Sequence, residues 1–211
     1  MEANILLADI GNTHFHIFDG KRIEHLSYDE AIKKYHSKKL YYITVKHQLT
    51  KEIEKILKWK NISSLITIES EYKTMGVDRK ALCLSHKNGV FIDAGSAITV
   101  DIVENGIYKG GFILLGIKAY LKGYESISLA LKTELNENID LNTLPKTTKD
   151  GISYGIIASI KEIISKHKHG KKLYFTGGDG AFLSTFFENV TYDEQLVFKG
   201  IEKILKEKKI C

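Results

Sequence analysis

The chain repeats one arrangement of apolar and polar positions in its two halves. An apolar run at residues 4–9 ends abruptly in Asp9, and a similar run at residues 89–93 ends in Asp93. Short apolar runs that are bounded by turn-forming residues are typical of buried strands. A glycine loop follows each run, so each half is predicted to begin with a strand that brings a carboxylate to one edge of a sheet.

Each glycine loop leads into two strands that are joined by a tight turn. The turn dipeptides are Asp19-Gly20 in the first half and Asn105-Gly106 in the second, and both are strong signals of a β-hairpin. A duplicated unit of strand, loop and hairpin predicts two similar lobes that face each other. We expect two α/β lobes with mixed sheets, at residues 1–86 and 87–211, with a cleft between them.

The other segments are predicted from the period of their apolar positions. A spacing of three to four residues indicates a helix, whereas alternation or a short apolar run indicates a strand. The helices are expected at residues 28–37, 50–57, 118–131, 150–167, 181–188 and 194–208. The strands that follow the first of each half are expected at residues 14–18, 21–26, 40–45, 65–68, 98–104, 107–115 and 172–176.

Composition narrows the class of protein. Hydrophobic residues make up 43% and charged residues 27% of the chain, which is typical of a folded globular protein. The net charge of +5 is spread along the chain without a basic stripe interleaved with aromatic side chains, so we expect no nucleic-acid partner. We also expect no signal peptide, no membrane span and no disulfide framework from Cys83 and Cys211, which suits a cytoplasmic protein.

A strand that ends in Asp-x-Gly suits phosphate chemistry. Glycine allows the backbone to turn and a phosphate to come close, and backbone N–H groups can then cradle its oxygens. Asp9 and Asp93 would repel a phosphate directly, so we expect them to hold cations such as Mg²⁺ that bridge to it. One such loop can also be an ordinary turn capped by Asp. The matched pair favours a clamp on a nucleotide for phosphoryl transfer.

Two further motifs could complete such a site. The glycine loop at residues 176–180 could bind ribose or phosphate, or could be a strand-to-helix turn with Asp179 as the N-cap. In the motif at residues 76–79, Asp78 could accept the proton of a substrate hydroxyl and Arg79 could bind a substrate carboxylate. Adjacent Asp and Arg residues are also a common surface pair, so this motif leaves both interpretations open.

In this order, the motifs resemble those of the bacterial type III pantothenate kinases. The resemblance covers nearly the whole chain, and it implies a duplicated ribonuclease H-like (actin-like ATPase) fold. It also implies ATP-dependent phosphorylation of the primary hydroxyl of pantothenate, the first step towards coenzyme A. The matching segments are residues 9–13, 76–79, 93–101, 110–113, 148–155 and 176–179.

On the substrate side, the resemblance implies one general base and one pocket. Asp78 would be the base, and Arg79 would bind the carboxylate of pantothenate. Thr148 would reach the pantothenate site of a partner subunit, so a homodimer is expected. The residues expected to bind the substrate are Tyr72, Gly76, Val77, Asp78, Arg79 and Thr148.

On the nucleotide side, the resemblance implies three loops and two kinds of cation. Asp9 would serve the Mg–ATP site, and Asp93 would coordinate the monovalent cation, potassium or ammonium, that the family requires. The residues expected at ATP are Asp9, Gly11, Asn12, Thr13, Gly95, Ser96, Ala97, Gly177 and Gly178, and those expected at the metals are Asp9 and Asp93.

The chain departs from the family pattern in places. Residues 113–116 read Ile-Leu-Leu-Gly where the family has Pro-Gly, Ser96 replaces the usual Thr, and the segment before Gly76 lacks the common proline, which leaves the role of Tyr72 open. Two alternatives are another phosphotransferase of the same fold, such as a sugar or acetate kinase, and a non-catalytic regulator or assembly ATPase. The motif that contains Asp78 and Arg79 favours a pantothenate kinase.

Overall fold

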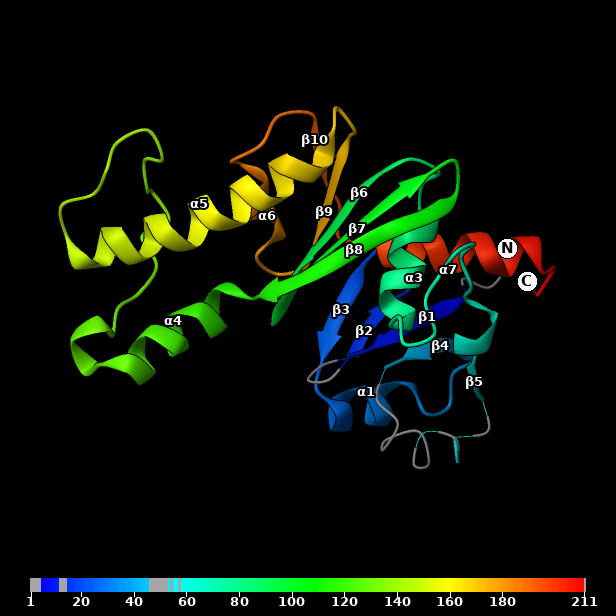
Figure 1. The fold of residues 1–211 in the computed structure, drawn as a ribbon. Helices are drawn as coiled ribbons and strands as arrows, with labels where there is room; N and C mark the ends of the chain where they lie inside the picture. Colours follow the sequence, from blue (N-terminus) through cyan, green and yellow to red (C-terminus); the bar gives the residue numbers. More distant parts are fainter. Residues whose placement is uncertain (1–4, 12–14, 46–52, 54, 57, 211) are drawn as a thin grey trace. The chain divides into compact units, whose positions relative to one another are not determined.

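A computed structural model describes residues 5–11, 15–45, 53, 55–56 and 58–210. They form two compact units, which are described separately (Figure 1). The first unit contains the chain up to Lys87, residues 104–108 and the chain from Glu194 onward, and the second contains residues 88–103 and 109–193. The C-terminal segment thus belongs to the first unit, whereas the division predicted from the sequence places it in the second lobe. The predicted cleft between the lobes stays a prediction.

The first unit is built on a mixed five-stranded sheet. β1 runs antiparallel to β2 and parallel to β4. The helix α1 lies between β3 and β4 in the chain and allows β4 to return beside β1 in the same direction. The strand order is β3 (Ile23–Leu26), β2 (Phe15–Phe18), β1 (Leu6–Ile10), β4 (Leu40–Thr44) and β5 (Trp59–Asn61).

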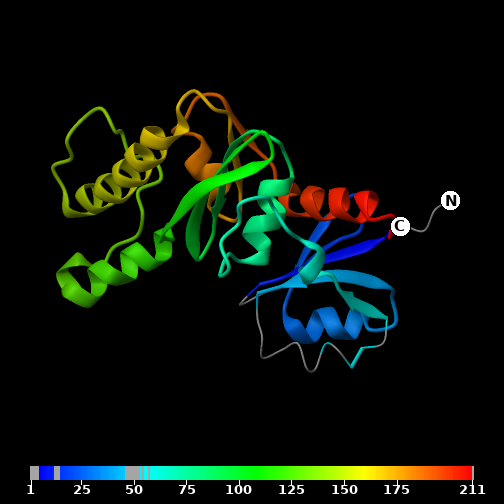
Figure 2. The same cartoon turned by 45° about the vertical axis from the view of Figure 1, so that its right-hand side comes forward.

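Helices cover both faces of this sheet. Ala31 of α1 (Tyr28–Tyr35) belongs to the buried cluster that contains Ile10 and Phe15. On the other face, α7 (Leu196–Glu207) stacks Phe198 on Phe18 of β2, with ring centroids 5.2 Å apart. The α3 helix (Val77–Leu84) packs against α7, as Figures 1 and 2 show. These contacts explain why the C-terminal helix belongs to the first unit.

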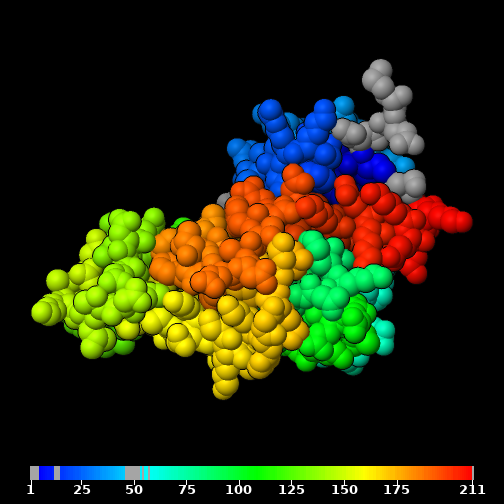
Figure 3. Space-filling view, turned by 90° about the horizontal axis from the view of Figure 1, so that it is seen from above, coloured from blue at the N-terminus to red at the C-terminus, as the bar shows by residue number. Residues whose placement is uncertain are grey.

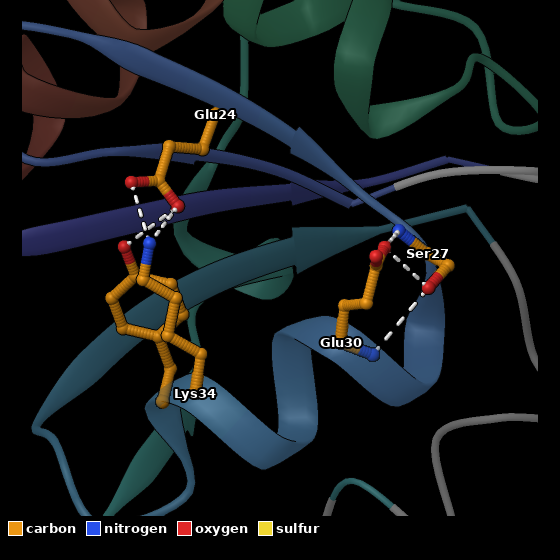
Figure 4. A network of polar contacts seen from close by, with 5 residues as sticks. Glu24, Ser27, Glu30 and Lys34 are labelled. Atoms are coloured by element: carbon orange, nitrogen blue, oxygen red, sulfur yellow. Dashed lines mark hydrogen bonds and ion pairs between the residues drawn. The ribbon is translucent and has the colours of Figure 1, made fainter.

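Local polar contacts determine where α1 begins. The Ser27 hydroxyl accepts a hydrogen bond from the Glu30 backbone N–H, and the Glu30 carboxylate accepts one of 2.9 Å from the Ser27 backbone N–H. This capping box satisfies N–H groups that the first turn leaves without helical partners. The Lys34 ammonium lies 2.7 Å from the Glu24 carboxylate, which joins α1 to β3 (Figure 4).

The second unit repeats this topology. Its sheet has the order β8 (Ile107–Leu115), β7 (Ala97–Glu104), β6 (Gly89–Ala94), β9 (Leu173–Thr176) and β10 (Val190–Tyr192). β6 is antiparallel to β7 and parallel to β9, as β1 is to β2 and β4. The two mixed sheets confirm the duplicated unit that was predicted from the repeated loops and hairpins.

Three helices and two short 3-10 turns complete the elements that the structure describes. Apolar residues of α5 (Thr148–Lys168) pack on one face of the second sheet, where they share a buried cluster with Val90 and Ile92 of β6. The remaining elements are α4 (Ile117–Ile127), α6 (Gly180–Ser184), η1 (Ser63–Leu65) and η2 (Leu129–Leu131). Among the residues that the structure describes, no helix combines the length and the apolar character needed to cross a membrane.

Some local predictions were wrong. Residues 65–68 form no strand: the η1 turn is followed by an isolated bridge at Glu69. Ile66 and Ile68 are buried, so their apolar character reflects packing in the core. A short apolar run cannot by itself distinguish a strand from another kind of buried segment. The sequence did not predict α3, β5 or β10, and most of the helix predicted at 50–57 lies outside the described residues.

Candidate active site

The start of α3 holds a partly buried carboxylate. Gly76 occupies the N-cap position and Asp78 lies in the first turn, where its Oδ1 accepts a 2.8 Å hydrogen bond from the Arg79 backbone N–H. A Cβ added at Gly76 would overlap this Oδ1, so the glycine leaves the space that the carboxylate occupies. Burial raises the pKa of Asp78, although the hydrogen bond from the Arg79 N–H and the Arg79 charge oppose the shift.

The Arg79 side chain is held beside Tyr72. Its Nη1 donates a 2.6 Å hydrogen bond to the Tyr72 hydroxyl, and its guanidinium carbon lies 5.8 Å from the centroid of the Tyr72 ring. Arg79 is only 7% exposed, whereas Tyr72 is exposed. The first unit therefore gathers five of the six predicted substrate residues in one place: Tyr72, Gly76, Val77, Asp78 and Arg79.

The first predicted phosphate loop begins at the end of β1. Asp9 is the penultimate residue of this strand. The carbonyl oxygen of Ile10 accepts a 3.2 Å hydrogen bond from Thr44, and that of Gly11 accepts one of 2.5 Å from Tyr28. These contacts hold the strand end in place. Asn12 and Thr13, which were predicted to lie near the phosphates, are outside the described residues.

The second loop lies between β6 and β7. Its tight turn is closed by a 3.0 Å hydrogen bond from the Gly95 N–H to the Ala97 carbonyl oxygen, and Ser96 is exposed at its tip. Asp93 lies directly opposite Thr99 in the strand register. The Thr99 hydroxyl is buried and makes no hydrogen bond within the described part of the chain. The loop thus places a carboxylate and a buried hydroxyl side by side.

The third loop packs against the second. Gly177 has a φ of +84°, and a Cβ added there would overlap Asp93 Oδ1 and lie 2.5 Å from the Ala94 carbonyl oxygen. The Asp179 N–H donates a 2.9 Å hydrogen bond to the same carbonyl group. Asp179 occupies the N-cap position of α6 as the simpler interpretation predicted, but its side chain makes no capping hydrogen bond. Partial burial raises the pKa of Asp179.

Gly116 supports the second loop. Its N–H donates a 3.2 Å hydrogen bond to the Ser96 carbonyl oxygen, and an added Cβ would overlap the Gly95 carbonyl oxygen. The departure from the family pattern at residues 113–116 therefore keeps the glycine that the packing requires. The sequence signal was a glycine between a predicted strand and a predicted helix.

Replacement of Gly116 by Ala is expected to displace the Gly95–Ser96 backbone, because the obstructing atoms belong to the main chain and cannot rotate away. On the phosphate-binding role that the sequence predicts for this loop, we expect the KM for ATP to rise about tenfold, equivalent to about 1.4 kcal/mol, with a smaller change in kcat. Steady-state kinetics with varied ATP measures both. Gly123→Ala is the control, because its added Cβ meets no atom within 4 Å. An unchanged KM in Gly116→Ala would contradict this role.

Asp101 received no role from the sequence. It is fully buried on β7, two residues after Thr99 and on the same face of the strand. The available signal was a pair of polar residues at alternate positions of an otherwise apolar strand.

Thr148, which was predicted to bind the substrate of a partner subunit, is exposed at the first position of α5. The described structure shows no hydrogen bond between it and the glycine loops.

Comparisons with solved structures define the fold class. An activator of 2-hydroxyisocaproyl-CoA dehydratase from Clostridium difficile, with bound ADPNP, has a TM-score of 0.56 at 11% identity and covers 98% of this chain and 97% of its own. A protein from Sinorhizobium meliloti described as a candidate 2-dehydro-3-deoxygalactonokinase has a TM-score of 0.61 at 8% identity, with 97% and 99% coverage. At these identities the likeness shows the fold alone, which is the actin-like ATPase fold predicted from the sequence.

Closer relatives define the family. The family model of the type III pantothenate kinases matches residues 48–168. Type III pantothenate kinases from Campylobacter jejuni and Helicobacter hepaticus are each 41% identical, over 96% of this chain and 97% and 99% of their own. A solved Campylobacter jejuni structure, described as a candidate Baf family transcriptional activator, has a TM-score of 0.90 at 38% identity and covers 98% of this chain and 100% of its own. The chain belongs to the type III pantothenate kinase family.

Proposed function

We propose that this protein transfers the γ-phosphoryl group of ATP to the primary hydroxyl of pantothenate. The observation that supports the proposal most strongly is the partly buried Asp78 carboxylate at the start of α3, followed directly by the buried Arg79. Burial raises the pKa of Asp78, which makes its carboxylate a better proton acceptor than an exposed one. Arg79 can bind the substrate carboxylate through two parallel hydrogen bonds.

The roles at this end of the reaction follow from the chemistry. Phosphoryl transfer to an alcohol needs the hydroxyl to be positioned and its proton to be accepted as the new bond forms. Asp78 accepts this proton, and Arg79 orients the substrate from its carboxylate end. Tyr72 holds Arg79 through its hydroxyl, while Gly76 and Val77 line the pocket. Thr148 of one subunit completes the pocket of the other.

At the nucleotide end, the glycine loops bind ATP and its cations. Asp9 would hold the Mg²⁺ that accompanies ATP, and Gly11, Asn12 and Thr13 would lie near the phosphates. Gly95, Ser96 and Ala97 face the γ-phosphate, while Gly177 and Gly178 lie near the adenosine. Asp93 and the buried Thr99 hydroxyl supply oxygen ligands of the kind that a hard monovalent cation prefers. A Cβ at Gly177 would overlap Asp93 Oδ1, so the glycine allows the Asp93 carboxylate to keep its position.

The monovalent cation gives a direct test. Replacement of potassium by sodium is expected to depress kcat. Asp93 and Thr99 supply the oxygen ligands in this proposal, and the smaller sodium ion would bind less well to ligands that are spaced for potassium. A coupled assay at constant ionic strength measures the effect. In Asp93→Asn the activity is expected to be low with both ions. Equal activity of the wild-type protein with potassium and sodium would contradict the cation role of Asp93.

Exposed apolar side chains in the second unit support a homodimer. Ile127 and Leu129, at the end of α4 and in η2, are 73% and 80% exposed, and Ile113, Leu115 and Leu144 are exposed as well. Large apolar side chains that stay exposed in one chain are covered when they lie in a protein–protein contact. Figure 3 shows the surface of residues 129–147 in yellow-green. A homodimer is thus part of the proposal, and we also propose that the protein acts in the cytoplasm, where its substrates are metabolised.

Light scattering tests the dimer. The wild-type mass is expected to be twice that of one chain, and Leu129→Asp is expected to shift the protein towards the monomer, because a charge in an apolar contact is costly. The exposed Lys109→Asp is the control for an added carboxylate and is expected to stay dimeric. A wild-type protein that is monomeric and fully active would contradict a role for Thr148 across an interface.

The substrate is tested with an ATP-coupled assay. Pantothenate is compared with a panel of other alcohols and with sugars, because Asp78 could serve any alcohol whereas Arg79 requires a carboxylate. We expect turnover with pantothenate and little with the uncharged alcohols. Turnover of a sugar, with none of pantothenate, would contradict this proposal and show that the protein is another phosphotransferase of the same fold.

A further inference from the structure

Two histidines face each other across the β2–β3 hairpin. His16 and His25 are directly opposed in the register of these antiparallel strands. Their Nδ1 atoms lie 2.6 Å apart, and the ring centroids are 4.8 Å apart at an interplanar angle of 77°. His25 is exposed and His16 is half-buried, so solvent reaches the pair. The pair has no part in the reaction proposed above.

The same row of the sheet contains Asp9. This residue of β1 is directly opposite His16 in the register of β1 and β2. Directly opposed residues of antiparallel strands share one face, with Cβ atoms about 4.5–5.5 Å apart. Asp9, His16 and His25 therefore follow one another across three neighbouring strands on one face of the sheet.

We propose that His16 and His25 form a chelating site for a divalent transition-metal ion such as Zn²⁺, Ni²⁺ or Cu²⁺. Imidazole nitrogen is a preferred ligand of these ions, whereas Mg²⁺ prefers oxygen, so Mg²⁺ does not compete for the pair. A cation held there places positive charge one strand away from Asp9. If Asp9 serves Mg–ATP as proposed, the occupied site disfavours Mg²⁺ binding and inhibits the kinase.

The geometry needs only a small change to bind the ion. The 2.6 Å separation is that of a hydrogen bond in which one Nδ1 donates and the other accepts. When the donor ring shifts its proton to Nε2, both Nδ1 lone pairs face the space between the rings. Two Zn–N bonds of about 2.05 Å at a tetrahedral angle place the nitrogens about 3.3 Å apart, which a small rotation of the solvent-exposed rings achieves.

Water completes the coordination. Among the described residues there is no group of three or more His, Cys, Asp or Glu side chains that could hold a metal ion. A site with two protein ligands binds reversibly and more weakly than a structural zinc site with four. The affinities are expected to follow the general order for nitrogen ligands, with Cu²⁺ above Zn²⁺ and Ni²⁺ and with Mn²⁺ weakest.

Binding is tested on the full-length protein without a histidine tag. Calorimetric titration with ZnCl₂, in excess Mg²⁺ that occupies oxygen sites, is expected to show one ion per chain in the wild-type protein. His25→Ala is expected to weaken this binding at least tenfold. The control is His36→Ala, which removes a solitary exposed histidine after α1 and should bind as the wild type does. Absent binding, or equal binding by His25→Ala, would overturn the proposal.

Inhibition is tested separately. With Mg–ATP in excess, ZnCl₂ is expected to inhibit the wild type and His36→Ala over the concentration range of the calorimetric binding, and a chelator should restore activity. His25→Ala should keep its basal activity and resist inhibition. Equal inhibition of His25→Ala would overturn the link to Asp9. A protein that binds Zn²⁺ at the pair but lacks kinase activity would refute the proposed function and leave the metal site standing.

Discussion

Asp78→Asn is expected to lower kcat for pantothenate phosphorylation by about 10²–10⁴-fold, the range that general-base catalysis contributes. Asn keeps the oxygen that accepts the hydrogen bond from the Arg79 N–H, so the start of α3 should retain its structure. It cannot accept the substrate proton. Single-turnover kinetics at saturating ATP and pantothenate isolates the chemical step.

The matched control for this variant is Asp29→Asn, which removes a carboxylate from the exposed first turn of α1. Its turnover should equal that of the wild type. If Asp78→Asn also turned over at a near-normal rate, Asp78 would not be the base, and the proposed mechanism would need another proton acceptor.

The same substitution is expected to stabilise the protein at neutral pH. Burial raises the pKa of Asp78 above its ordinary value of 3.8, so the folded state holds this proton more tightly than the unfolded chain does. The resulting stabilisation is complete below pH 3.8 and is lost as the pH rises through the folded pKa. Asn cannot lose a proton and avoids this loss.

Denaturant titrations of the two proteins test this reasoning. Wild type and Asp78→Asn should have similar midpoints below pH 3.8, and the variant should have the higher midpoint at pH 7. A variant that is less stable than the wild type at pH 7 would show that the charged carboxylate is stabilised by its surroundings. A gain in stability with a loss of turnover is typical of active-site residues.

Gly200→Ala is expected to lower the free energy of unfolding by about 2 kcal/mol, within the range observed for overpacking. The added Cβ would overlap the Ala81 carbonyl oxygen and lie 2.7 Å from the carbonyl carbon, so α7 and α3 must move apart. Alanine is favoured over glycine in a helix by about 1 kcal/mol, but the overlap involves backbone atoms that cannot rotate away and therefore dominates.

Thermal unfolding measures this loss, which corresponds to a decrease in Tm of roughly 4–8 °C for a chain of this size. Because α3 carries Asp78 and Arg79, kcat/KM should also fall at temperatures where the variant is folded. Lys206→Ala, on an exposed position of the same helix, is the control and should change the free energy of unfolding by less than about 0.5 kcal/mol. An unchanged Tm in Gly200→Ala would contradict the close packing of α3 and α7.

Features that depend on neighbouring residues were predicted well. The Asn105-Gly106 hairpin is present, with φ of 55° and 82° at its two residues, because this dipeptide tolerates positive φ. The Asp19-Gly20 turn is longer than predicted, and β3 begins at Ile23. The Asp19 carboxylate accepts 2.8 Å hydrogen bonds from the N–H groups of Lys21 and Arg22, which extends the turn.

Elements that depend on distant partners were missed. β5 and β10 have three residues each, and their strand conformation comes from the longer strands beside them. The α3 helix has eight residues and no capping side chain, because Gly76 occupies its N-cap position. A local pattern of this length carries little signal, so no helix was predicted at residues 77–84.

The order of residues along the chain established the repeated loops, the hairpins and the chemistry of the motifs, because turn geometry and apolar period are local properties. Folding in three dimensions added the burial that raises the pKa of Asp78, the packing of Gly177 against Asp93, and the position of α7 on β1 and α3. The packing of Gly177 and the position of α7 depend on contacts between segments that are far apart in sequence. The burial of Asp78 depends on such segments excluding water. No short stretch of sequence contains that information.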